Sequence, residues 1–181
     1  GVTLLRQAGT IFVLALIVRL LYVALVNETM GTDGFMSPDS GVYLRAAAEV
    51  AGGDAFIRYH NYNSIFPTTI WLFAAIMAIT GSTDPLAIVL VQGGVDACTC
   101  VAIALLARQL VPELFGIAGI LAALNPTQIV LSGLALTDSL FLFFATVALA
   151  LALSLFSRTP PSRCLLWGLA FGAALGLALS T

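Results

Sequence analysis

The stretch MSPDSGVYLRAAAE, residues 36–49, is strongly polar in a chain that is otherwise apolar enough to lie in lipid. It belongs to a polar insert, residues 27–64, that holds five of the nine acidic residues and the only histidine. The chain is 60% hydrophobic and 9% charged, with a mean hydropathy of +1.06. Such a composition excludes a soluble globular domain and predicts membrane helices on both sides of an insert that stays in water.

Apolar runs outside the insert predict the membrane helices. They cover residues 7–27, 67–80, 86–106, 114–133, 136–156 and 164–181. Within the insert, Val42, Ala46 and Val50 recur at helical spacing beside polar residues, which predicts a helix lying along the membrane surface. The expected fold is an all-α, polytopic transmembrane bundle that forms one module over residues 1–181. An external loop, residues 28–63, carries its surface helices.

Arginines in short loops predict the orientation, because they favour the cytoplasmic side. Arg6, Arg158 and Arg163 therefore predict a cytoplasmic amino terminus. The expected location is an integral position in the bacterial inner (plasma) membrane. If residues 67–80 and 86–106 both cross, residues 114–133 either cross fully or fold back at Asn125-Pro126. We favour the fold-back, because it keeps Arg158 and Arg163 inside, although it leaves Arg108 outside.

Two charges fall within predicted membrane helices. Arg19 lies in the first run, and Asp96 lies in the middle of the run over residues 86–106. An acid at the bilayer centre is by default a functional candidate. We favour the alternative, a buried structural ion pair between Arg19 and Asp96.

Two aspartates at predicted helix starts are the candidate catalytic residues. Asp39 follows Pro38 at the start of the surface helix, and Asp138 follows Thr137 at the start of a very apolar helix. Each carboxylate can serve chemistry at the membrane edge or simply cap its helix, and both readings stay open.

The segment after the surface helix contains further candidates. Arg58 and His60 can bind phosphate or a metal beside Asp39, or they can belong to an interfacial polar belt. Basic clusters and zinc-ligand spacings are absent from the sequence, so nucleic acid is not an expected partner.

The order of these parts resembles the amino-terminal part of the C-type membrane glycosyltransferases, close to the protein-mannosyltransferase and aminoarabinose-transferase branch. The resemblance rests on Asp39 with Tyr43 four residues later, Gly52-Gly53 and Phe66-Pro67. Further along it rests on the segments 105–110, 122–126, 136–140 and 168–177. The chain departs from many relatives at Ser40, where they carry a second acid.

The resemblance implies a transferase that moves a sugar from a polyprenyl-phosphate donor to an acceptor at the outer face of a membrane. Asp39 and Asp138 would be its catalytic acids and would share a divalent metal ion. Tyr43, Arg58 and His60 would bind substrate. The membrane lipid and the lipid-linked sugar would be its partners.

A second hypothesis is a truncated, non-catalytic subunit that packs in a larger membrane complex. Gly168, Gly172 and Gly176 repeat every four residues, which permits close contact with helices of other membrane subunits.

Overall fold

The computed structural model describes residues 2–53, 67–158 and 161–181, and every regular element in these ranges is a helix. In chain order the elements are α1 (Val2–Met30), η1 (Gly31–Phe35), α2 (Ser40–Ala51), α3 (Pro67–Thr80), α4 (Pro85–Leu110), η2 (Pro112–Leu114), α5 (Phe115–Ala123), α6 (Pro126–Ser132), α7 (Asp138–Arg158) and α8 (Pro161–Leu179). The prediction of an all-α polytopic bundle is confirmed.

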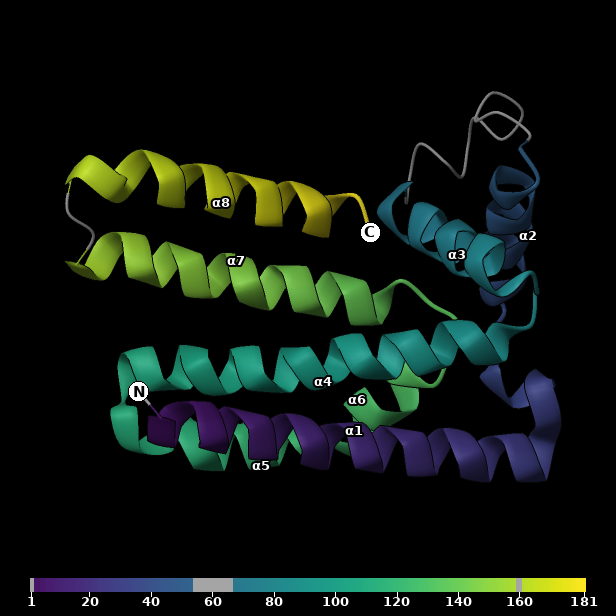
Figure 1. Ribbon diagram of the computed structural model, residues 1–181, viewed down its shortest axis with the longest axis horizontal. Helices are drawn as coiled ribbons and strands as arrows, with labels where there is room; N and C mark the ends of the chain where they lie inside the picture. Colours follow the sequence, from purple (N-terminus) through teal and green to yellow (C-terminus); the bar gives the residue numbers. More distant parts are fainter. Residues whose placement is uncertain (1, 54–66, 159–160) are drawn as a thin grey trace.

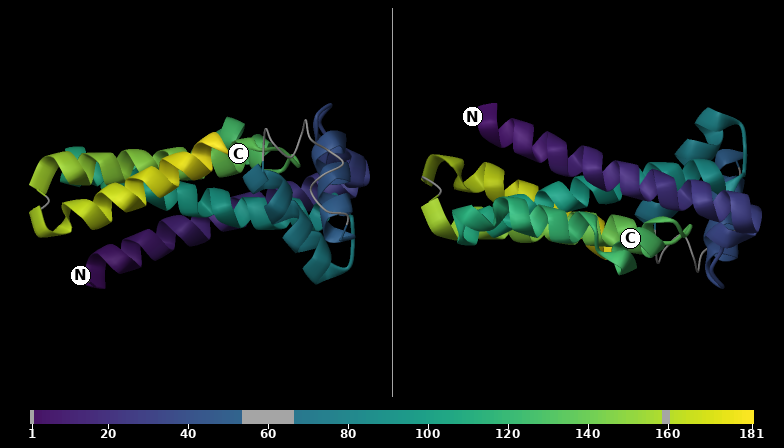
Figure 2. Two further views of the ribbon diagram at one scale, coloured as in Figure 1. Left: turned by 90° about the horizontal axis from the view of Figure 1, so that it is seen from above. Right: turned by 90° about the horizontal axis from the view of Figure 1, so that it is seen from below.

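The long helices lie roughly parallel to one another along the molecule (Figure 1). In that view α8, α7 and α4 follow in order, and α1 and α5 lie on the far side of α4. Figure 2 shows that α1 is tilted, so its amino-terminal turns diverge from α7 and α8. The helices α1, α4 and α7 are long and apolar enough to cross a membrane.

The two ends of the bundle carry opposite charge. We call the end where α1 finishes and α4 begins the acidic end, and the opposite end the arginine-rich end. The elements at the acidic end carry Glu28, Asp33, Asp39, Glu49, Asp84 and Asp138, together with Arg45. The elements at the arginine-rich end carry Arg6, Arg108, Arg158 and Arg163, together with Glu113.

The helix α3 does not form the second span that its apolar sequence predicts. It has 14 residues, about 21 Å of helix, which is shorter than a hydrocarbon core of about 30 Å. It lies beside α2 at the acidic end, and α4 begins at that same end (Figure 1). Phe73 and Met77 of α3 pack against Tyr43 of α2 and Ile88 of α4. The helix α3 is therefore part of the structure that covers the acidic end.

Residues 112–132 form a bent pair of helices that leads away from the arginine-rich end, where it begins, whereas the predicted fold-back would return it there. Asn125 caps α6, its side chain accepting from Thr127 N at 3.0 Å, and the pair bends by 55° at this break. From α5 to the connection after α6, this segment contacts residues that lie progressively later in α1 and then in η1. In chain order the contacts are Gly119 beside Ile11, Ala123 with Arg19, and Ala135 with Phe35. The segment therefore travels from the arginine-rich end to the acidic end.

The two differences from the predicted topology, at α3 and at the α5–α6 pair, cancel in their effect on the end at which α7 begins. Because α3 stays at one end and the α5–α6 pair crosses, α7 still begins at the acidic end. Arg108, which the predicted fold-back left on the outer side, closes α4 at the same end of the bundle as Arg6.

Candidate functional site

The start of α2 leaves the Asp39 side chain exposed. Asp39 occupies the N-cap position, but its side chain makes no capping hydrogen bond. The turn is held instead by Ser40, whose Oγ accepts from Ser37 N at 2.9 Å. The Asp39 side chain therefore does not cap the helix, and its carboxylate is exposed.

Asp138 is also exposed, in the first turn of α7. The connection before it, residues 133–137, is held at two points. Ala135 N donates to Phe35 O at 3.0 Å, and Gln92 Nε2 donates to Leu136 O at 2.5 Å. Since Phe35 lies four residues before Asp39, the first of these bonds joins the segment that leads to one candidate acid with the segment that leads to the other.

Tyr43 has one candidate acid on its own helix and packs against the segment that leads to the other. It is buried in α2, one turn after Asp39, and it packs in a cluster that includes Ala135 and Leu136. Burial raises the pKa of Tyr43 above its ordinary value of 10.0, and the negative charges of Asp39 and then Asp138 raise this pKa further. Both carboxylates are thus near enough to act on one phenol.

Arg58 and His60, predicted to bind substrate, lie outside the described residues. The described residues contain no group of three or more His, Cys, Asp or Glu side chains that could hold a metal ion. A divalent ion such as Mg²⁺ or Ca²⁺ prefers six or more oxygen ligands, some of them water. Asp39 and Asp138 provide two carboxylates, so the shared metal remains a prediction that needs further ligands.

Arg19 and Asp96 form an ion pair within the bundle. Arg19 Nη2 lies 2.5 Å from Asp96 Oδ2, and both side chains are almost completely buried. The Arg19 Nε also donates to this oxygen, at 2.6 Å. The Asp96 carboxylate is therefore occupied as the partner of an arginine.

The arginine also binds the broken helix, which sequence reasoning missed. Its Nη1 donates to Ala123 O at 2.7 Å, and its Nη2 lies 3.5 Å from Ala122 O. Ala122 O also accepts from Asn125 N at 3.3 Å. In a continuous helix Ala123 O would accept from Thr127 N. That N–H donates instead to Asn125 Oδ1 at 3.0 Å, so Arg19 replaces the missing donor. The capping asparagine before Pro126 was the signal that a carbonyl at this depth loses its helical donor.

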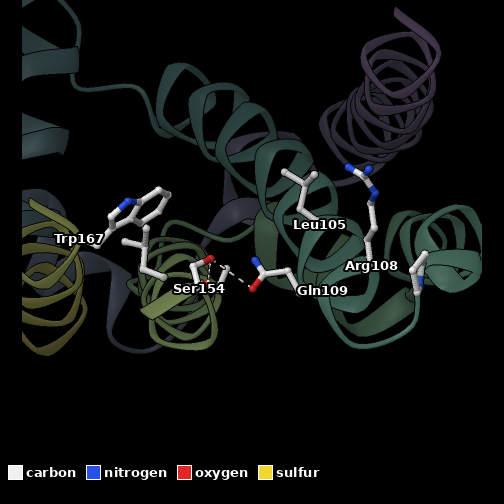
Figure 3. Close-up of a pocket in the computed structure, with 8 residues that line it drawn as sticks. Leu105, Arg108, Gln109, Ser154 and Trp167 are labelled. Atoms are coloured by element: carbon white, nitrogen blue, oxygen red, sulfur yellow. Dashed lines mark hydrogen bonds between the residues drawn. The ribbon is translucent and has the colours of Figure 1, made fainter. Parts of the chain in front are cut away.

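A cavity of about 480 Å³ lies at the arginine-rich end (Figure 3). Ser154 of α7 donates to Gln109 Oε1 of α4 across it at 3.3 Å. The lining residues are mostly apolar: Leu105, Arg108, Gln109, Pro112, Ala150, Leu151, Ser154 and Trp167. None of the predicted site residues lines this cavity, and it lies at the end of α4 opposite to Asp39 and Asp138.

The comparisons with known proteins agree with the helical architecture. The family model for dolichyl-phosphate-mannose-protein mannosyltransferase matches residues 63–181, about two thirds of the chain. The matched range contains Asp138 and begins after Asp39 and Tyr43. No curated protein and no solved structure matches the chain. By the extent of the family match, the chain belongs to the dolichyl-phosphate-mannose-protein mannosyltransferase family of membrane glycosyltransferases.

Proposed function

We propose that this chain forms part of a transferase that moves a sugar from a polyprenyl-phosphate donor to an acceptor hydroxyl at the acidic end of the bundle. The observation that carries the proposal is the packing of Tyr43, one turn after Asp39, with Ala135 and Leu136, the residues that lead into Asp138. Family membership supports the reaction class.

The acidic end faces away from the cytoplasm in this proposal. Arg6 and Arg108 share the opposite end with the last residue of α7, Arg158, and the first turn of α8, which contains Arg163. Arginine in short loops favours the cytoplasmic side of a membrane, so this arrangement supports a cytoplasmic amino terminus. A bacterial inner membrane is the proposed location.

In the reaction, the acceptor oxygen forms a bond to the anomeric carbon of the sugar while the bond from that carbon to the phosphate oxygen breaks. The polyprenyl phosphate leaves with the bonding electrons, and the acceptor's proton passes to Asp39. Asp138, as the second acid, orients the acceptor or holds a divalent ion that screens the leaving phosphate. Arg58 and His60 are the proposed phosphate ligands from the chain.

The test measures sugar transfer in membranes that contain the full gene product. Labelled polyprenyl-phosphate sugar and the corresponding nucleotide sugar are offered in parallel, with membranes lacking the gene as the control. The proposal expects gene-dependent transfer from the lipid-linked donor alone. Transfer from the nucleotide sugar in the absence of polyprenyl phosphate would contradict it.

A second candidate function, a non-catalytic subunit, is favoured by one observation. A Cβ atom added at Gly168, Gly172 or Gly176 would meet no atom within 4 Å, so this face of α8 is open for another helix. Isolation of the full protein from native membranes with a stoichiometric partner, combined with no transfer activity, would favour this function over the first.

A further inference from the structure

Gln92 is a buried polar residue to which the proposed reaction gives no role. It lies in α4 and is completely buried, 0% exposed. Its Nε2 donates to the main-chain carbonyl of Leu136 at 2.5 Å, a contact between α4 and the connection that leads into α7. Leu136 is two residues before Asp138.

The amide of Gln92 is not fully satisfied by this contact. The main-chain carbonyl oxygen of Leu136 can only accept a hydrogen bond. The Gln92 atom that faces it must therefore be the amide nitrogen, Nε2. The remaining oxygen, Gln92 Oε1, is buried and has no hydrogen-bond partner among the described residues. Leaving such an atom unpaired is unfavourable, so an apolar residue at this site would suit stability at least as well. The role left for the Gln92 amide is therefore its one hydrogen bond, from Nε2 to Leu136 O in the connection before α7.

Besides its packing in the cluster around Tyr43, the connection makes a further hydrogen bond to another element among the described residues. Ala135 N donates to Phe35 O at 3.0 Å, which joins it to η1 and so to the start of α2. The two hydrogen bonds act on adjacent residues from two different elements. Together they join the segment just before α7 to α4 and to η1, the element that leads into α2.

We infer that Gln92 is a positioning residue that holds Asp138 in register with Asp39 through its hydrogen bond to Leu136 O. The inference rests on the proposed function, since it assigns Gln92 to the site of that reaction. Gln92 itself touches neither acid in this role and acts through the main chain.

The first measurement is a distance and needs no substrate. Genetically encoded spin-labelled residues replace Gly41, where an added Cβ atom would meet no atom within 4 Å, and Phe141, which is exposed. These labels report on the starts of α2 and α7 without removing either acid. The full protein is studied in lipid nanodiscs by pulsed electron paramagnetic resonance.

The variants isolate the hydrogen bond from packing. Gln92→Met keeps the length and volume of the side chain but cannot donate. Gln92→Glu, measured at a pH low enough to protonate its carboxyl, keeps an O–H donor and should rescue. Gln128→Met is the matched control, because Gln128 of α6 also has a buried, unpartnered Oε1.

The expected result is a distance distribution that broadens or shifts in Gln92→Met and stays as in the wild type in Gln92→Glu and Gln128→Met. In the transfer assay Gln92→Met should lower kcat about tenfold, with KM within about twofold, because reacting groups are displaced rather than lost. An unchanged distribution in Gln92→Met overturns the inference, as does a Gln92→Glu variant that is perturbed like Gln92→Met. Absence of transfer by the wild type would contradict the proposed function and leave the distance result standing.

Discussion

Arg19 of α1 and Asp96 of α4 meet inside the bundle, with the Arg19 Nε 2.6 Å from Asp96 Oδ2 and both side chains almost completely buried. The guanidinium also donates to Ala15 O at 3.1 Å and to Ala123 O at 2.7 Å. One side chain thus joins α1 and α4 to the end of α5.

Removing one charge of this pair should destabilise the protein more than removing both. A lone buried charge typically costs 3–5 kcal/mol, about the range we expect for Arg19→Met or Asp96→Leu alone. The double variant should be more stable than either single variant. Thermal unfolding in detergent measures the cycle, and simple additivity of the two effects would contradict the pairing.

The path of the chain can be tested by labelling introduced cysteines with a membrane-impermeant reagent. Asp33→Cys reports on η1, Ser82→Cys on the α3–α4 turn, and Glu113→Cys on η2. The structure predicts that Asp33→Cys and Ser82→Cys react from one side of the membrane and Glu113→Cys from the other. If Ser82→Cys reacted from the side opposite to Asp33→Cys, α3 would be a span after all. Protein without added cysteines is the control for the three native cysteines, Cys98, Cys100 and Cys164.

The close contact between α1 and the end of α6 predicts a steric effect at Gly133. A Cβ atom there would lie 2.4 Å from Cε1 of the Tyr22 ring, which has little freedom to move away. Gly133→Ala should therefore lower stability by about 1–3 kcal/mol, the usual range for overpacking. Gly168→Ala is the control, since its Cβ meets nothing within 4 Å and alanine favours helix. Equal thermal stability of the two variants would contradict the packing described for Gly133.

Hydropathy predicted the class of fold because each membrane helix must satisfy its own backbone in lipid. It misjudged α3, since an apolar run of 14 residues has the composition of a span without its length. The break at Asn125-Pro126 was visible from proline chemistry. The direction of the chain after this break could not be predicted, because a local break does not indicate whether the next helix continues onward or turns back. That information lies in the contact of Ala135 with Phe35, 100 residues apart in sequence.

The candidate site, like the fold, was predictable only in part. Asp39 and Asp138 were recognisable because acids at the ends of apolar helices are unusual and match a family pattern. Gln92 was not, since its role depends on a side chain reaching a main-chain carbonyl 44 residues away. Periodicity within α4 cannot indicate such a contact.

The environment of Tyr43 gives a pH-dependent test of the two acids. A raised pKa means that the folded protein favours the neutral phenol, so this contribution to stability is present below pH 10.0, the ordinary pKa, and is lost as the pH rises through the folded-state pKa. Asp39→Asn and Asp138→Asn each remove a negative charge and should lower the Tyr43 pKa. Phenolate absorbance, corrected with Tyr43→Phe, measures it. Asp33→Asn is the control. An unchanged Tyr43 pKa in Asp138→Asn would contradict the electrostatic link between α2 and α7.

The rate of sugar transfer in aspartate variants tests most directly whether Asp39 and Asp138 form one catalytic site. The full gene product is assayed as wild type, Asp39→Asn, Asp138→Asn, the double variant and Asp33→Asn, the last a control for an exposed acid at the same end. Each single substitution at the candidate site should lower kcat about 100-fold or more, as removal of an acid–base group does. The double variant should be no slower than the slower single variant, because residues that act as a unit are not additive. Wild-type transfer by Asp138→Asn, or multiplication of the two effects in the double variant, would contradict a shared site.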